Sequence, residues 1–145
     1  MPRVRSINST RRNWVPRTVK LVRTCLIVSD VAKVREFYRA VFQVDPVSDF
    51  PEYAEFDLAG GGLALFNLRG QEALAPGSAE PGKNRCSMIE VEVDDVDREF
   101  ERLGPLVTDW VKPPTTQSWG SRSVYFRDPE GNLVNFFTRA KSSPP

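Results

Sequence analysis

Two short stretches of the chain, residues 21–28 and 86–93, alternate between apolar and other side chains. In the second stretch Ile89, Val91 and Val93 are apolar, and the side chains between them point the other way. Alternation with a period of two predicts a strand that buries one of its faces. We therefore expect one strand in each stretch.

A helical spacing of apolar residues follows each predicted strand. Apolar side chains recur every three or four positions over residues 31–41 and 96–103, and Asp30 and Asp95 stand where a helix N-cap is expected. Three short apolar runs, separated by turn residues, then complete each half of the chain. We expect strands at residues 46–50, 52–58 and 63–68 in the first half and at residues 105–111, 123–127 and 133–139 in the second.

The two halves also resemble each other residue by residue. Asp30 and Val31 match Asp95 and Val96 at an offset of 65 residues, and further matches follow at an offset of 70. Such a repeat indicates a tandem duplication. We predict an α+β fold of two strand–helix–three-strand (βαβββ) modules, at about residues 20–69 and 85–139. The matches at offset 70 pair Phe56, Gly61, Leu63 and Phe66 with Phe126, Gly131, Leu133 and Phe136.

The absence of histidine from all 145 residues removes several kinds of chemistry. A Ser-His-Asp or Cys-His nucleophile and an imidazole metal ligand are excluded. Two cysteines, Cys25 and Cys86, are too few for a disulfide framework, which favours a cytoplasmic location. No apolar run reaches the roughly 18 residues that a membrane span needs, so we expect no membrane partner.

Charge is unevenly distributed along the chain. Residues 1–29 carry seven basic side chains and no acidic one, whereas residues 30–145 carry 13 basic and 19 acidic ones. We expect residues 1–19 to be a flexible basic leader, residues 20–139 to form the folded domain and residues 140–145 to be a disordered tail. A basic leader can bind nucleic acid, but a solvated leader is the more common case, so nucleic acid is not an expected partner.

Three segments carry a resemblance to a known family: residues 29–42, 93–104 and 119–137. The last segment joins Trp-Gly-Ser-Arg to the turn sequence Asp-Pro-Glu-Gly-Asn. With these motifs the chain resembles the vicinal oxygen chelate superfamily, which includes glyoxalases, extradiol dioxygenases and bleomycin-resistance proteins. The resemblance implies a half-open, cupped mixed sheet with helices on its outer face, a small-molecule ligand in the cup, and pairing of two chains as a homodimer.

Enzymes of that superfamily hold a divalent metal at four places in the sheet. The resemblance puts those places at Arg23, Leu65, Met88 and Asn135. A divalent ion of this kind needs carboxylate or imidazole donors, and these four side chains supply neither. We therefore expect no metal and no other cofactor, as in the antibiotic-binding members of the superfamily.

Alternation also predicts which side chains line the cup. Arg23 and Glu90 are its charged residues, and they either pair with each other or meet a charged ligand. Trp110 and Trp119 lie near a long loop that can stack on a planar ligand, whereas Arg122 either braces that loop or binds the ligand. The expected ligand-binding residues are Arg23, Cys25, Leu65, Asn67, Met88, Glu90, Trp110, Trp119, Arg122, Asn135 and Phe137.

Three functions remain open from the sequence. The first is a metal-independent small-molecule-binding protein, similar to drug-sequestering resistance proteins. The second is a metal-free isomerase, cyclase or lyase that uses Glu90 as a base or Cys25 as a nucleophile. The third is an accessory interaction domain with a vestigial cleft. A metal-dependent glyoxalase or dioxygenase ranks below these, because the metal donors are missing.

Overall fold

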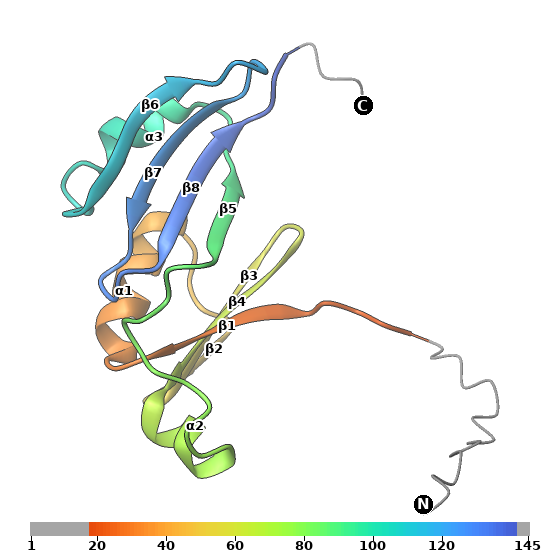
Figure 1. The fold of residues 1–145 in the computed structure, drawn as a ribbon, viewed down its shortest axis with the longest axis vertical. Helices are drawn as coiled ribbons and strands as arrows, with labels where there is room; N and C mark the ends of the chain where they lie inside the picture. The colour runs from red at the N-terminus through yellow and green to blue at the C-terminus, as the bar shows by residue number, and fades with distance from the viewer. Residues whose placement is uncertain (1–17, 142–145) are drawn as a thin grey trace, which may run out of the picture.

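The computed structural model describes residues 18–141, so most of the expected leader and tail lies outside the described residues. Within that range eleven helices and strands follow one another along the chain (Figure 1). The first module contains β1 (Arg23–Val28), α1 (Val31–Phe42), β2 (Ser48–Phe50), β3 (Tyr53–Leu58) and β4 (Gly61–Asn67), and α2 (Leu68–Leu74) follows it. The second contains β5 (Met88–Glu92), α3 (Val96–Leu103), β6 (Trp110–Thr116), β7 (Arg122–Arg127) and β8 (Leu133–Thr138).

Each module forms its own four-stranded mixed sheet. The strand orders are β1-β4-β3-β2 and β5-β8-β7-β6, so the two sheets have the same topology. The first and last strands of each module pair in parallel, and the other neighbours pair antiparallel. The predicted α+β fold of two βαβββ modules is confirmed, and both sheets are open.

The structure corrects two predicted elements. Residues 105–109 do not form a strand, because the backbone N–H groups of Leu106 and Val107 both donate to the Leu103 carbonyl and continue the end of α3 as a turn. The strand begins instead at Trp110 and includes two prolines, which an edge strand with irregular pairing tolerates. The short helix α2 was not expected; Asn67 caps it by accepting a hydrogen bond from the Gly70 N–H at 2.8 Å.

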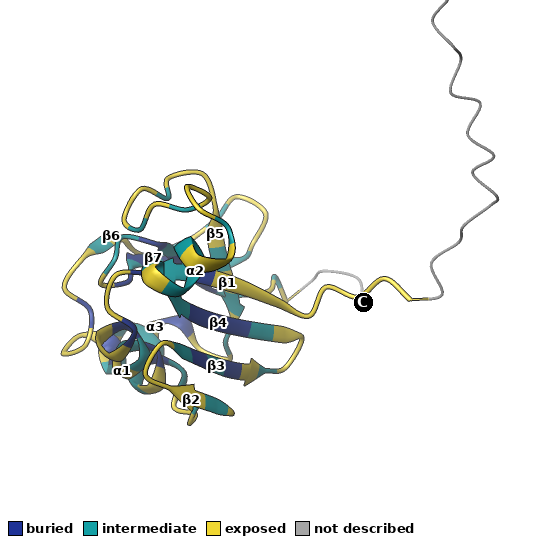
Figure 2. Cartoon of the chain, turned by 90° about the horizontal axis from the view of Figure 1, so that it is seen from below, coloured by how far each residue is buried: buried dark blue, intermediate teal, exposed yellow. Residues whose placement is uncertain are grey.

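The helix-bearing faces of both sheets share one hydrophobic core. Leu26, Phe56 and Leu65 enter it from the first sheet, and Phe126 and Phe136 enter it from the second. Helix α1 lies between the sheets, and the ring of its Phe37 lies 6.3 Å from the ring of Phe126 (Figures 1 and 2). The opposite face of each sheet looks away from this core, and we call it the open face of that module.

The turn between β7 and β8 ties the second module to the first helix. Asp128 in this turn accepts a hydrogen bond from the buried Tyr38 hydroxyl of α1 at 2.7 Å. Glu130 accepts hydrogen bonds from the backbone N–H groups of Ser29 and Asp30, just before α1 begins, at 2.7–3.0 Å. Burial beside Asp128 raises the pKa of Tyr38 well above its usual value of 10.0. These contacts, which we call the turn latch, fix the relative position of the two modules.

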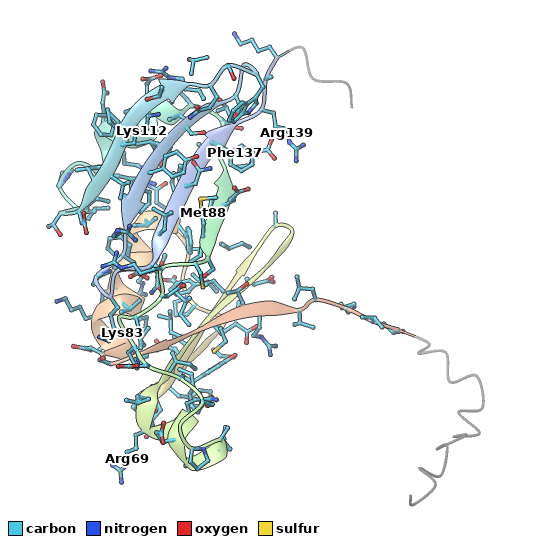
Figure 3. All side chains as sticks on the ribbon, viewed as in Figure 1. Arg69, Lys83, Met88, Lys112, Phe137 and Arg139 are labelled. Carbon is cyan, nitrogen blue, oxygen red and sulfur yellow. The ribbon has the colours of Figure 1, made fainter. Side chains whose placement is uncertain are left out.

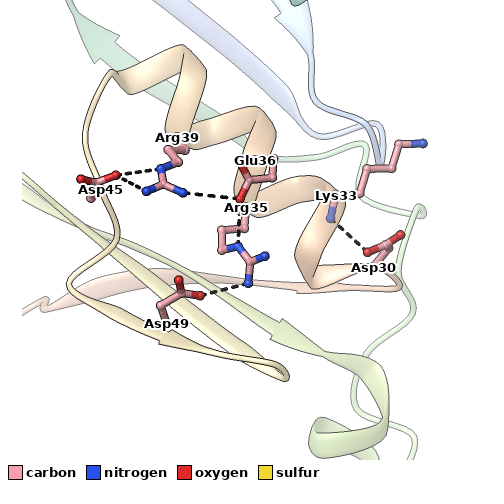
Figure 4. Close-up of polar contacts among 7 residues, drawn as sticks. All are labelled: Asp30, Lys33, Arg35, Glu36, Arg39, Asp45 and Asp49. Carbon is pink, nitrogen blue, oxygen red and sulfur yellow. Dashed lines mark hydrogen bonds and ion pairs between the residues drawn. The ribbon is translucent and has the colours of Figure 1, made fainter.

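Ion pairs hold the solvent side of α1 to the chain that follows it. Arg35 donates to Asp49 at 3.0 Å and Arg39 to Asp45 at 2.7 Å, while Asp30 caps the helix through the Lys33 N–H (Figure 4). Such exposed pairs each contribute little stability, but together they orient the connection to β2. Among residues 18–141, no helix is long and apolar enough to cross a membrane.

Candidate functional site

Strand register identifies the side chains that share each open face. In the first module Cys25, Ala64 and Glu55 occupy one row across β1, β4 and β3. In the second module the corresponding row continues across all four strands. Its members are Glu90, Asn135, Tyr125 and Lys112.

The predicted position of Leu65 on the cup is wrong. Leu65 is fully buried in the shared core, where it pairs in register with Leu26 and Ala54. The cause is hairpin length, since Phe56 pairs with Leu63 but Phe126 pairs with Val134, one residue further along. The offset between β4 and β8 is therefore 71 residues, and Ala64 is the counterpart of Asn135. A shift of one residue moves a side chain to the other face of a strand.

Asn67 is also misplaced by the sequence argument, because it lies at the end of β4 and caps α2. The predicted pair between Arg23 and Glu90 is not formed either. The Arg23 Nε instead donates to the Glu55 carboxylate at 2.9 Å, across the first open face.

A compact polar cluster thus occupies the open face of the first module. Glu55 accepts a second hydrogen bond from the Tyr53 hydroxyl at 2.8 Å. The hydrogen bonds from Tyr53 and Arg23 hold the pKa of Glu55 below its usual value of 4.5. Every charge in this cluster has a partner within the chain. Strand alternation could have revealed Tyr53 and Glu55, since Ala54 between them and Phe56 after them are apolar.

Cys25 lies beside this cluster and is a free cysteine, as is Cys86. One sequence-based alternative uses Cys25 as a nucleophile, which requires a low thiol pKa. Partial burial, however, raises the pKa of Cys25 above 9.0, and the nearby Arg23 offsets only part of that rise. A thiol with a raised pKa carries little thiolate near neutral pH and is a weak nucleophile. The structure therefore gives no support to Cys25 as a catalytic residue.

The open face of the second module differs in having an unmatched polar group. Asn135 is only 5% exposed, and its side-chain oxygen Oδ1 is buried without a hydrogen-bond partner in the described part of the chain. Glu90 lies next to it in register, and apolar Met88 and Phe137 lie on the same face of β5 and β8 (Figure 3). The predicted placement of Met88, Glu90, Asn135 and Phe137 on one face is confirmed.

An open cleft of about 980 Å³ runs along β5 between the two modules. The β3–β4 hairpin forms one side, and the ends of α1 and α3 form another. Met88, Glu90 and Phe137 reach it from the second open face, but none of the other predicted ligand residues lines it. Apolar side chains with a few polar groups are the usual lining of a small-molecule site.

The two tryptophans occupy different environments. Trp110 packs on the helix side of its sheet, with its ring 4.7 Å from Phe100 and 5.7 Å from Phe126, so the prediction that it lies over the cup is wrong. Trp119 lies between β6 and β7 and is 70% exposed. Only Trp119 of these two is free to contact a ligand.

Arg122 braces α3, whereas the sequence predicted that it braces the nearby loop or binds the ligand. Its guanidinium donates to both carboxylate oxygens of Asp97 at 2.7 Å and to the Thr116 hydroxyl at 3.0 Å. The Asp97 carboxylate raises the pKa of Arg122, and the guanidinium in turn lowers the pKa of Asp97. A side chain held in this way packs toward the helix rather than toward the open face.

The metal positions of the superfamily do not fit a divalent ion in this chain. With Leu65 replaced by its true counterpart, the four places are Arg23, Ala64, Met88 and Asn135. One amide is the only oxygen donor among these side chains. Residues 18–141 contain no group of three or more His, Cys, Asp and Glu side chains arranged to hold a metal.

Comparison with known proteins identifies relatives of similar length. The chain is 28% identical over 126 residues to the Bacillus subtilis protein YraH, covering 82% of this chain and 98% of YraH. It is 27% identical over 110 residues to the phenazine antibiotic resistance protein EhpR of Enterobacter agglomerans, covering 74% and 82% of the two chains.

Solved structures and a family model point the same way. A glyoxalase/bleomycin resistance protein/dioxygenase from Nocardioides superposes with a TM-score of 0.74 at 27% identity, over 92% of this chain and 91% of that one. The model of one family matches residues 20–136, which include both modules. The chain therefore belongs to the glyoxalase/bleomycin resistance protein/dioxygenase superfamily.

Proposed function

We propose that this protein binds a planar, partly aromatic small molecule, leaves it chemically unchanged, and thereby sequesters it in the manner of a resistance protein. Proteins of the superfamily bind small molecules and often form dimers. One relative is named for resistance to phenazines, which are flat, fused aromatic compounds. We assign the same class of ligand to this chain.

The observation that carries the proposal is the cleft along β5. Its volume of about 980 Å³ is within the range of ligand sites, and Met88, Val91 and Phe137 give it apolar walls. A flat apolar ligand gains free energy there by burying its surface, at roughly 25 cal/mol per Å². Trp119 does not line the cleft, but its exposed ring on the loop before β7 is proposed to stack on the part of the ligand that extends out of the open cleft.

Two copies of the chain are proposed to pair, so that each open face is covered. Several large apolar side chains remain exposed in a single copy, among them Leu21 at 90%, Val19 at 84% and Met88 at 40%. Because β1 and β5 are both free edges of their sheets, a second copy can approach either of them. The dimer is proposed to act in the cytoplasm, where free cysteines stay reduced.

The proposed binding requires no metal and no catalytic group. Of the two candidate catalytic residues, Cys25 has a raised pKa, which makes it a weak nucleophile. The metal positions lack suitable donors, as described above. These features favour binding over turnover.

A fluorescence titration with unsubstituted phenazine tests the proposal. We expect quenching of tryptophan emission and a dissociation constant on the order of micromolar, from ring burial together with stacking of about 0.5–1.5 kcal/mol per contact. Trp119→Ala should weaken binding without altering the fold, and the more buried Trp110→Phe is the matched control. Absence of binding at saturating phenazine would refute the proposal.

Two further measurements separate the proposal from its alternatives. Phenazine recovered after incubation with catalytic amounts of EDTA-treated protein should be unchanged by mass, and a product would instead establish an enzyme. Sedimentation at micromolar concentration should show a dimer. A monomer that still binds phenazine would contradict the proposed dimer but would be consistent with sequestration.

A further inference from the structure

We infer that the second open face selects ligands that carry a protonated nitrogen, which Glu90 and the Asn135 amide hold together, and that it disfavours ligands carrying a carboxylate. This inference rests on the proposed function, because it specifies the chemistry of the molecule that enters the cleft along β5. Glu90 lines that cleft, and Asn135 lies outside the lining but next to Glu90 in register on the second open face. It follows from two polar groups on β5 and β8. Among the described residues, the buried Asn135 Oδ1 has no hydrogen-bond partner and the exposed Glu90 has no ion-pair partner.

Asn135 provides the first observation. Buried polar atoms nearly always have a hydrogen-bond partner, and leaving one unpaired costs free energy. Its Oδ1 is nevertheless buried and unpaired in the described structure, although the side chain is 95% removed from solvent. The neighbouring core residues Val134 and Phe136 point to the opposite face, so the amide is directed at the open face. An N–H group brought by a ligand satisfies this oxygen once a neighbouring side chain moves aside.

Glu90 provides the second observation. It pairs in register with Asn135 on the adjacent strand, and it forms no ion pair within residues 18–141. Arg139, a nearby cation, is already paired with Glu92 at 3.1 Å. Lys112 stands at the far end of the same row, three strand spacings or about 14 Å away, beyond the range at which a salt-screened charge has much effect.

The two groups together define a preferred ligand. A carboxylate and an amide oxygen side by side both accept hydrogen bonds, and the carboxylate adds a negative charge. A protonated amine or amidine offers several donors and the opposite charge. Met88 and Phe137 flank the pair with apolar surface, so the nitrogen is best carried on a flat apolar body. The first open face lacks this selectivity, because Arg23 already neutralises Glu55.

Two probes with the same ring and opposite charge test the inference: aminomethylphenazine and phenazine carboxylate. We expect the amine to bind at least roughly tenfold more tightly, as one charge-assisted hydrogen bond predicts. Glu90→Gln should remove most of this preference. Glu101→Gln, which loses the same charge from the solvent side of α3, is the matched control and should leave the preference unchanged.

Asn135 variants add a second measurement, the melting temperature of the ligand-free protein, which does not depend on the probes. Asn135→Leu should weaken binding of the amine roughly tenfold while leaving the melting temperature of the ligand-free protein unchanged or raised, because a buried unpaired polar group is removed. Asn135→Asp keeps the acceptor and should retain binding of the amine. A clear fall in the melting temperature of Asn135→Leu would mean that the amide is already satisfied and would overturn the inference.

The outcomes distinguish the inference from the proposed function. Equal affinity for both probes, or tighter binding of the carboxylate, would overturn the inference and leave sequestration of flat aromatic ligands intact. Failure of both probes and of unsubstituted phenazine to bind would overturn the proposed function and the inference with it.

Discussion

The two modules have the same strand order, but their open faces differ in whether the polar side chains are paired. On the first, Glu55 accepts hydrogen bonds from Tyr53 and Arg23, so its charge is balanced within the chain. On the second, Glu90 has no ion pair among the described residues and the Asn135 Oδ1 has no hydrogen-bond partner. The two modules thus differ on their open faces, which lie outside the core. Their helix-side faces still pack together in one shared core.

This difference separates the requirements of stability from those of binding. Core positions on the two sheets match each other, as Phe56 matches Phe126 and both are fully buried. Positions on the open faces do not match, and the second face keeps one buried amide oxygen, Asn135 Oδ1, whose desolvation no described residue offsets. A polar group left in this state costs free energy in the ligand-free protein and is available to a ligand.

The largest expected effect concerns the two residues that sequence comparison aligned. Leu65→Ala should destabilise the protein by about 2–5 kcal/mol, because it opens a cavity in the shared core. Asn135→Ala should change the free energy of unfolding by less than about 1 kcal/mol. Urea unfolding of both variants measures the difference. Similar losses of unfolding free energy in the two variants would mean that both side chains face the core. The contrast between core and open face would then be wrong.

The second expected effect tests the turn latch. This contact joins the helix of the first module to the last hairpin of the second, and the tyrosine that forms it has no equivalent in the second module. Tyr38 has Leu103 as its counterpart in the second module, and only Tyr38 has a hydroxyl for Asp128. Tyr38→Phe should cost about 1–3 kcal/mol near neutral pH. Loss of a similar amount in Tyr53→Phe, the control on the open face, would argue against a special role for the latch.

The same tyrosine predicts a dependence of stability on pH. Its folded-state pKa lies above the unfolded value of 10.0, so the unfolded chain releases the proton first as the pH rises. The stabilisation is complete below about pH 10 and is lost as the pH rises from there through the folded pKa. Tyr38→Phe should flatten this part of the stability profile in urea titrations between neutral and alkaline pH.

A smaller effect is expected from Glu130, which satisfies two backbone N–H groups before α1. Glu130→Ala should cost about 0.5–2 kcal/mol, the usual range for removing a helix cap. Hydrogen exchange should increase at Ser29 and Asp30 more than in the second module. Unchanged exchange at these two amides would show that solvent replaces the carboxylate without loss.

The smallest expected effect concerns the first open face, where Arg23 pairs with Glu55. Arg23→Met should raise the pKa of Glu55 toward 4.5, because one of its two hydrogen bonds is lost. The stabilisation linked to Glu55 is present above its unfolded pKa and is lost as the pH falls through the folded value. Carboxyl chemical shifts followed by NMR report this pKa. The same variant should slow alkylation of Cys25, since Arg23 lowers the pKa of that thiol.

Local patterns in the sequence were sufficient for most of the fold. Alternation placed Ile89, Val91 and Val93 against the core and Met88, Glu90 and Asn135 on the open face, because each strand buries one side. Helical spacing and the caps Asp30 and Asp95 located α1 and α3. These features depend on a few neighbouring residues, so the chain displays them directly.

The remaining features depend on tertiary contacts. The sequence argument aligned Gly61 with Gly131 and therefore missed the extra residue of the β7–β8 hairpin. As a result, it assigned Leu65 to the wrong face of its strand. Contacts such as Arg23 with Glu55 follow from strand register. Trp110 was expected near the long loop, whereas its ring packs on Phe100 and Phe126. An unsatisfied Asn135 has no sequence signal, since only the surrounding atoms show that a partner is lacking.

The turn latch has a consequence for the order in which the chain folds during synthesis. Tyr38 and Asp128 are 90 residues apart, and Ser29 and Glu130 are 101 apart. The backbone N–H groups of Ser29 and Asp30 thus lack their Glu130 partner, and Tyr38 lacks its Asp128 partner, until the last hairpin has left the ribosome. Long-range contacts of this kind form late, so the first module emerges as an incomplete unit that the final strands complete.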